Sequence, residues 1–77
     1  MIRIGGKVLR WGRVNSGAWC LEARLCGLEI ELYVWQDKGY WERENRDGEV
    51  VRYKTREEAQ KAEERDLQQS IGAIEII

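Results

Sequence analysis

Two consecutive segments of this 77-residue chain alternate apolar and polar side chains, and a single short turn separates them. The apolar row of the first segment is Trp19, Leu21, Ala23 and Leu25, and its polar row is Cys20, Glu22, Arg24 and Cys26. In the second segment the inward row is Leu28, Ile30, Leu32 and Val34, and the outward row is Glu29, Glu31, Tyr33 and Trp35. A period of two is typical of half-buried strands, and Cys26-Gly27 suits a two-residue turn. The pattern therefore predicts an antiparallel hairpin with one buried face.

Glycine positions predict the strands on either side of this hairpin. Ile2–Ile4 and Val8–Val14 read as one first strand that Gly5-Gly6 interrupts with a bend or a bulge. After the hairpin, Asp47-Gly48 predicts a second tight turn, which joins Tyr40–Arg46 to Glu49–Lys54. These segments extend the hairpin into an antiparallel sheet of about four strands.

The register of the strand that begins at Tyr40 depends on the loop before it. Asp37-Lys38-Gly39 suits a three-residue loop, and in that register Trp35 faces Trp41. The same register brings Tyr33 opposite Arg43. A loop one residue longer or shorter would move Trp41 to the other face of the sheet, because side chains alternate with period two.

The last third of the chain predicts one helix and a short strand. Thr55 and Glu58 form a capping box, and the helix is expected from Arg56 to about Ile71. Its thin apolar side consists of Ala59, Ala62, Leu67 and Ile71. The apolar tail 73–77 alternates, which predicts a last strand with Ile74 and Ile76 inward. The fold class is α+β in one small domain, residues 1–77, with an antiparallel sheet followed by one α-helix packed on it.

The tail leaves two alternatives open. It can complete the sheet of its own chain, because a helix of about 16 residues spans roughly 24 Å and can return the chain to an open edge. It can instead pair with a second copy, because unpaired strand edges invite association and a small core gains from enlargement. The isoleucines at the terminus favour the homodimer slightly.

The residue types disfavour catalysis. The chain has no histidine and no close cysteine pair, so no metal ligands cluster and no metal or other cofactor is expected. Ser16 and Ser70 have no evident activating base. No catalytic residue is assigned, and an enzyme is not expected.

The cysteines and the hydropathy indicate a cellular location. Cys20 and Cys26 lie in one predicted strand and would be roughly 20 Å apart at about 3.3 Å per residue, which is too far for a disulfide. Unpaired cysteines are typical of a reducing compartment. No segment resembles a signal peptide or a membrane span. The expected location is the cytoplasm of a host cell.

Aromatic side chains form the best candidate for a binding surface. Four tryptophans occur in the first 41 residues, and tryptophan is enriched where binding energy concentrates. The candidate partner-binding residues are Tyr33, Trp35, Trp41, Arg43, Glu29 and Glu31. Aromatic residues with an arginine are typical of an interface centre, and surrounding acid favours a protein partner with a basic surface. The alternative is that the helix covers this face and that the aromatic residues belong to the core.

A basic N-terminal segment supports a second function. Before Glu22 the chain carries no acidic residue, and its basic residues there are Arg3, Lys7, Arg10 and Arg13. Such a segment can bind nucleic acid, with help from exposed aromatic residues that stack on bases. The overall charge of −1 disfavours phosphate binding, and the segment could simply pair beside Glu29 and Glu31.

The order of these elements resembles a group of short phage- and prophage-encoded accessory proteins. The resemblance covers residues 17–68 and includes the tryptophan-rich strands, Gly39-Tyr40-Trp41, the Asp47-Gly48 turn and the run from Tyr53 to Ala62. In this group an antiparallel meander precedes one helix opened by an aromatic-x-Thr-x-Glu-Glu-Ala run. Some proteins of this kind, such as anti-CRISPR proteins, inhibit host defence systems by occupying surfaces. The resemblance implies a non-catalytic protein-binding module, an inhibitor or adaptor that blocks a host protein complex.

Overall fold

The computed structural model describes residues 1–25 and 27–77. They form one helix and two antiparallel sheets, so the α+β class is confirmed. The strands are β1 (Ile2–Ile4), β2 (Lys7–Leu9), β3 (Gly12–Asn15), β4 (Ala18–Leu25), β5 (Leu28–Asp37), β6 (Tyr40–Glu44), β7 (Val50–Tyr53) and β8 (Glu75–Ile76). Helix α1 spans Arg56–Ser70.

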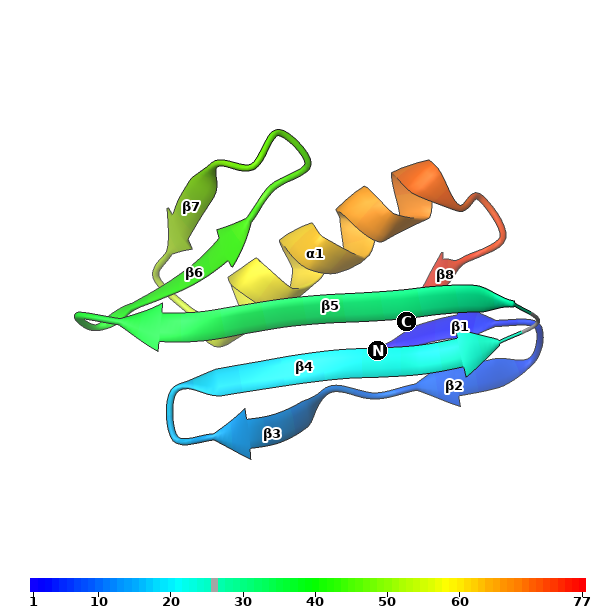
Figure 1. Ribbon diagram of the computed structural model, residues 1–77, viewed down its shortest axis with the longest axis horizontal. Helices are drawn as coiled ribbons and strands as arrows, with labels where there is room; N and C mark the ends of the chain where they lie inside the picture. The colour runs from blue at the N-terminus through cyan, green and yellow to red at the C-terminus, as the bar shows by residue number, and fades with distance from the viewer. Residues whose placement is uncertain (26) are drawn as a thin grey trace.

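The two sheets differ in size and in how they are built. The large sheet has five strands in the order β3-β4-β5-β6-β7, and the small sheet has three in the order β2-β1-β8. In Figure 1, β4 and β5 are the two long strands, and β6 and β7 splay away from β5 with α1 behind the gap. The helix packs against β5, β6 and β7, and it also contacts β8.

The β4–β5 hairpin has the register that its alternation predicts. Leu21 lies opposite Leu32 and Ala23 opposite Ile30, so both apolar rows share one face. We call this the inner face of the large sheet and the opposite one the outer face. The turn between the strands includes Cys26, so its predicted conformation and its distance from Cys20 lie outside the described residues.

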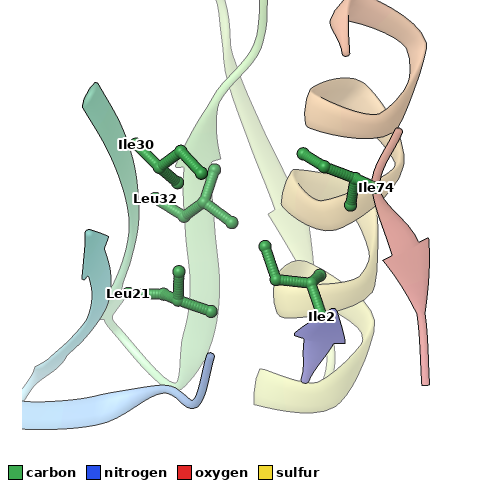
Figure 2. Close-up of a cluster of buried hydrophobic side chains, with 5 residues drawn as sticks. All are labelled: Ile2, Leu21, Ile30, Leu32 and Ile74. Carbon is green, nitrogen blue, oxygen red and sulfur yellow. The ribbon is translucent and has the colours of Figure 1, made fainter. Parts of the chain in front are cut away.

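The main core lies between the inner face and the small sheet. Figure 2 shows Leu21, Ile30 and Leu32 pointing toward Ile2 and Ile74, and none of these five side chains is more than 4% exposed. Fully burying a leucine- or isoleucine-sized side chain contributes about 1.5–3 kcal/mol. The large sheet and the small sheet are therefore held together mainly by aliphatic packing.

The prediction of one interrupted first strand is wrong. Gly5 and Gly6 have φ values of 55° and 78°, and they turn the chain back so that Ile4 lies opposite Lys7. Two consecutive positive φ angles make a tight hairpin turn rather than a bulge. The basic segment consequently lies in two sheets, and β3 pairs with β4 instead of lying beside Glu29 and Glu31.

The predicted register between β5 and β6 is also wrong by one residue. Asp37 lies opposite Tyr40, Gln36 opposite Trp41, and Trp35 opposite Glu42. Lys38 and Gly39 have φ values of 52° and 83° and form a two-residue turn. Turns of this kind match the twist of the flanking strands. In the predicted three-residue loop only Gly39 would be left-handed, whereas in the two-residue turn Lys38 is left-handed as well.

The helix and the tail follow the sequence closely. Thr55 accepts a hydrogen bond from the backbone N–H of Glu58 at 3.2 Å, and its hydroxyl donates to the Glu58 carboxylate at 3.0 Å. After the helix, Ile74 is buried and β8 pairs with β1, with Ile76 opposite Ile2. The tail thus completes a sheet of its own chain, and it no longer gives a reason to expect a homodimer.

Candidate protein-binding face

The outer face of the large sheet carries aromatic residues that lie outside the main core, among them Tyr33 and Trp35. Tyr33 is 41% exposed there, and its ring centroid lies 5.9 Å from that of Trp35. Trp35 is half-buried and lies over its cross-strand neighbour Ala18, which is buried. Tyr33 and Trp35 form the centre of this face, and we call them the aromatic pair.

Trp35 is oriented by polar contacts with the neighbouring strands. Its indole N–H donates to the Glu42 carboxylate at 2.9 Å, and Arg52 donates to the other Glu42 oxygen at 2.7 Å. The hydrogen bond from Arg52 is the main reason that the pKa of Glu42 lies below its ordinary value; burial opposes it and the bond from Trp35 adds to it. Glu42 therefore carries a charge at neutral pH and holds the indole in place.

Carboxylates outnumber guanidinium groups around the aromatic pair. The charged residues of the outer face are Glu22, Arg24, Glu29, Glu31, Asp37, Glu42, Glu44 and Arg52. Arg24 pairs with Glu29 at 3.7 Å, and Arg52 pairs with Glu42. Within the described part of the chain, no ion pair neutralises Glu22, Glu31 or Glu44.

Two of these unneutralised carboxylates lie directly opposite each other. Glu22 is the cross-strand partner of Glu31. Opposite residues have Cβ atoms about 4.5–5.5 Å apart, and like charges at this spacing are destabilising. The pair is tolerated by the fold rather than required by it, and a cation placed on the outer face would relieve its repulsion.

A groove of ≈ 390 Å³ opens between β5 and β6 beside the aromatic pair. Its lining residues are Glu31, Tyr33, Trp35, Glu44 and Glu63. Glu63 comes from α1 and reaches the groove because β6 diverges from β5 beyond Trp35 (Figure 1). Burial raises the pKa of Glu63 above its ordinary value, although the hydrogen bond from Arg43 acts in the opposite direction. We call this site the acidic groove.

Trp41 and Arg43 do not belong to the outer face, contrary to the prediction. The one-residue difference in register turns both toward α1, where Arg43 is only 5% exposed. Its guanidinium donates to Glu63 at 2.9 Å, to Tyr53 at 3.4 Å and to Asp66. Burial alone would lower the pKa of Arg43, but these three hydrogen bonds outweigh it and raise the pKa. Arg43 joins the β6–β7 hairpin to the helix.

The same difference in register brings Glu42 and Glu44 to the outer face, although they were not among the binding residues predicted from the sequence. They alternate with Trp41 and Arg43, so the signal was present in the strand itself. The sequence does not indicate which of these two rows faces outward, because Tyr40–Glu44 is polar or aromatic at every position.

The basic residues proposed for nucleic acid do not form one stripe. Arg3 and Lys7 point to opposite faces of the small sheet, because Lys7 pairs with Ile4 rather than with Arg3. Arg13 lies in β3 on the same face as Trp19, and Arg3 contacts Glu75 at 3.3 Å. All of Arg3, Lys7, Arg10 and Arg13 are exposed.

Cys20 lies on the outer face opposite Tyr33. Burial raises the pKa of its thiol above the ordinary value, and the charges of Glu22 and Glu31 add to this effect. The thiol is therefore protonated at neutral pH and a weak nucleophile. Within residues 1–25 and 27–77, no group of three or more metal-ligating side chains is assembled, and no helix is long and apolar enough to cross a membrane.

Comparisons with known proteins add no relative: no family model, no curated protein and no solved structure matches this chain.

Proposed function

We propose that this protein is a non-catalytic protein-binding module that uses the outer face of its large sheet to bind a basic surface on a host protein. Tyr33 and Trp35 would form the centre of the interface, and Glu22, Glu29, Glu31 and Glu44 its acidic rim. Interface centres are enriched in tyrosine and tryptophan, and charged rims steer a partner of opposite sign.

The observation that carries this proposal is the unneutralised pair of Glu22 and Glu31 beside an exposed tyrosine. A fold selected for stability alone gains nothing from two opposed carboxylates, since each could be replaced by a neutral residue. A basic partner would contribute the missing positive charge. An inhibitor or adaptor that occupies a basic surface of a host complex, in the cytoplasm, fits this chemistry.

Nucleic-acid binding through Arg3, Lys7, Arg10 and Arg13 is the competing function. It would need basic side chains gathered along one path for phosphates. The opposite orientations of Arg3 and Lys7 and the acidic outer face weigh against it. Possible self-association has no support from the tail, which pairs within its own chain.

Affinity capture from host lysate, with nuclease-treated and untreated samples, separates these functions. The wild type should retain a protein with a basic surface, and Tyr33→Ser and Glu31→Lys should release it. Glu49→Lys is the matched control, because Glu49 is exposed in the β6–β7 loop. Its replacement by lysine changes the charge by the same amount as Glu31→Lys. Gel shifts with duplex and single-stranded oligonucleotides complete the test. Salt-sensitive binding to nucleic acid that Tyr33→Ser and Glu31→Lys leave intact, with no protein retained, would contradict the proposal.

A further inference from the structure

One edge of β5 lacks a strand partner over much of its length. On the β4 side, all eight residues from Leu28 to Trp35 are paired. On the β6 side, pairing covers only Trp35, Gln36 and Asp37. The stretch 28–34 therefore presents a free edge within the described part of the chain.

The direction of the backbone groups on this edge follows from one hydrogen bond. The N–H of Gln36 donates to Gly17 on the β4 side at 2.6 Å. Backbone N–H and C=O groups alternate between the two sides of a strand, so those of Tyr33, Glu31 and Glu29 point to the free edge. The Tyr33 N–H faces the Glu63 carboxylate of α1, where it acts to lower the pKa of Glu63 against the effect of burial. The groups of Glu31 and Glu29 remain available for another strand.

The acidic groove lies beside this free edge. Glu31 and Tyr33 contribute both to the edge and to the lining of the groove, and Glu44 closes it from β6. A strand added along β5 would lie about 4.8 Å from it and would place alternate side chains on the outer face. One such side chain would enter the groove, where it would meet two aromatic rings and the carboxylates of Glu31 and Glu44.

These contacts select a cationic side chain. A guanidinium or ammonium group gains from an aromatic face and from carboxylates that no other cation neutralises. On its other face, the added strand would pass over the gap beside α1, where Leu32 and Leu67 offer apolar surface to an aliphatic side chain among charged neighbours. A peptide that alternates arginine or lysine with valine or isoleucine satisfies both faces.

We propose that the partner binds by adding an extended segment, with alternating basic and aliphatic residues, as a new strand on the Leu28–Leu32 edge of β5. One basic side chain of this segment occupies the acidic groove. The inference rests on the proposed function of the outer face and adds how the partner binds there. Strand addition of this kind takes affinity from main-chain hydrogen bonds and specificity from alternate side chains.

Amide hydrogen exchange by NMR tests the proposal on the wild-type chain. The probe is a capped peptide of about seven residues that alternates arginine and valine. At saturation it should slow exchange of the Glu29 and Glu31 amides by about tenfold or more, because both become hydrogen-bonded. The Ile30 and Leu32 amides point to β4 and should change little. A peptide N-methylated at the residues whose amides face β5 has the same charge, but its methyl groups keep that edge from approaching β5, so it should give no protection.

Variants of Glu31 separate main-chain pairing from charge. Glu31→Gln removes the charge and keeps the N–H, so it should weaken peptide binding by about two- to fivefold. Glu31→Pro also removes the N–H on the free edge, where proline is tolerated, and should weaken binding by a further tenfold or so. Circular dichroism must show that both variants are folded; if Glu31→Pro is not, the N-methylated peptide gives the same comparison.

Failure of the strand-addition inference and failure of the proposed function give different experimental results. Peptide binding that shifts the Tyr33 and Trp35 ring resonances without protecting Glu29 and Glu31 would overturn strand addition and leave the binding face intact. No binding of the peptide would overturn this inference as well, and capture of a host protein would then decide the proposed function separately.

Discussion

The indole N–H of Trp35 donates to the carboxylate of Glu42, its cross-strand partner, at 2.9 Å. This contact follows from a register in which Lys38 and Gly39 alone connect β5 to β6. This register separates aromatic residues that the predicted register would have placed together on one face of the sheet. Tyr33 and Trp35 lie on the outer face, and Trp41 turns toward the helix.

The conformation of Lys38 provides a test of that register. A non-glycine residue in the left-handed region loses stability, and asparagine loses less than lysine. Because Lys38 has φ 52°, Lys38→Asn should stabilise the protein by about 0.5–1 kcal/mol in urea unfolding. In a three-residue loop this position would be right-handed, and the substitution would then give no gain.

Arg43 should contribute strongly to stability although it was predicted to lie on the binding face. Its buried guanidinium bridges β6 and α1 through Glu63 and Asp66. Arg43→Ala leaves these carboxylates without their cation and should cost about 3–5 kcal/mol. Arg46→Ala, a change at an exposed arginine two residues after β6, should stay within about 0.5 kcal/mol. Equal effects of the two substitutions would contradict the buried network.

The aliphatic core should respond to truncation on both of its sides. Ile30→Ala and Leu32→Ala in β5, and Ile74→Ala before β8, should each cost about 2–5 kcal/mol. Val50→Ala is the control, because Val50 is 57% exposed. Light scattering should show the same mass for Ile74→Ala as for the wild type, since Ile74 packs within its own chain. A halved mass would instead support a dimer through the tail.

Sequence reasoning located the elements that have a strong local signal. The alternation from Trp19 to Val34, the capping box of Thr55 and the inward Ile74 all appear in the structure as expected. It failed where the choice depended on backbone dihedral angles. Gly5-Gly6 could bend a strand or reverse it, and Lys38 gave no sign that it adopts a positive φ. The candidate site changed with the second error, because a shift of one residue exchanges the two faces of a strand.

The charge of Glu42 makes part of the stability depend on pH. Its folded-state pKa is lowered, mainly by the hydrogen bond from Arg52, so the unfolded chain binds the proton more readily. The contribution is therefore complete above the ordinary glutamate pKa of about 4.3 and is lost as the pH falls through the lower folded-state value. Urea unfolding of the wild type and Glu42→Gln should differ at pH 7 and converge in acid. A difference that is independent of pH would exclude this role for the Glu42 charge.

The most direct test of the account is the affinity of variants for a purified host partner, measured by calorimetry. We predict that Tyr33→Ala weakens binding by at least about tenfold, as expected for a residue at an interface centre, and that Glu31→Lys weakens it further. Glu49→Lys should bind as the wild type does. If Tyr33→Ala and Glu31→Lys are folded and bind with unchanged affinity, the outer face of the large sheet is not the binding surface.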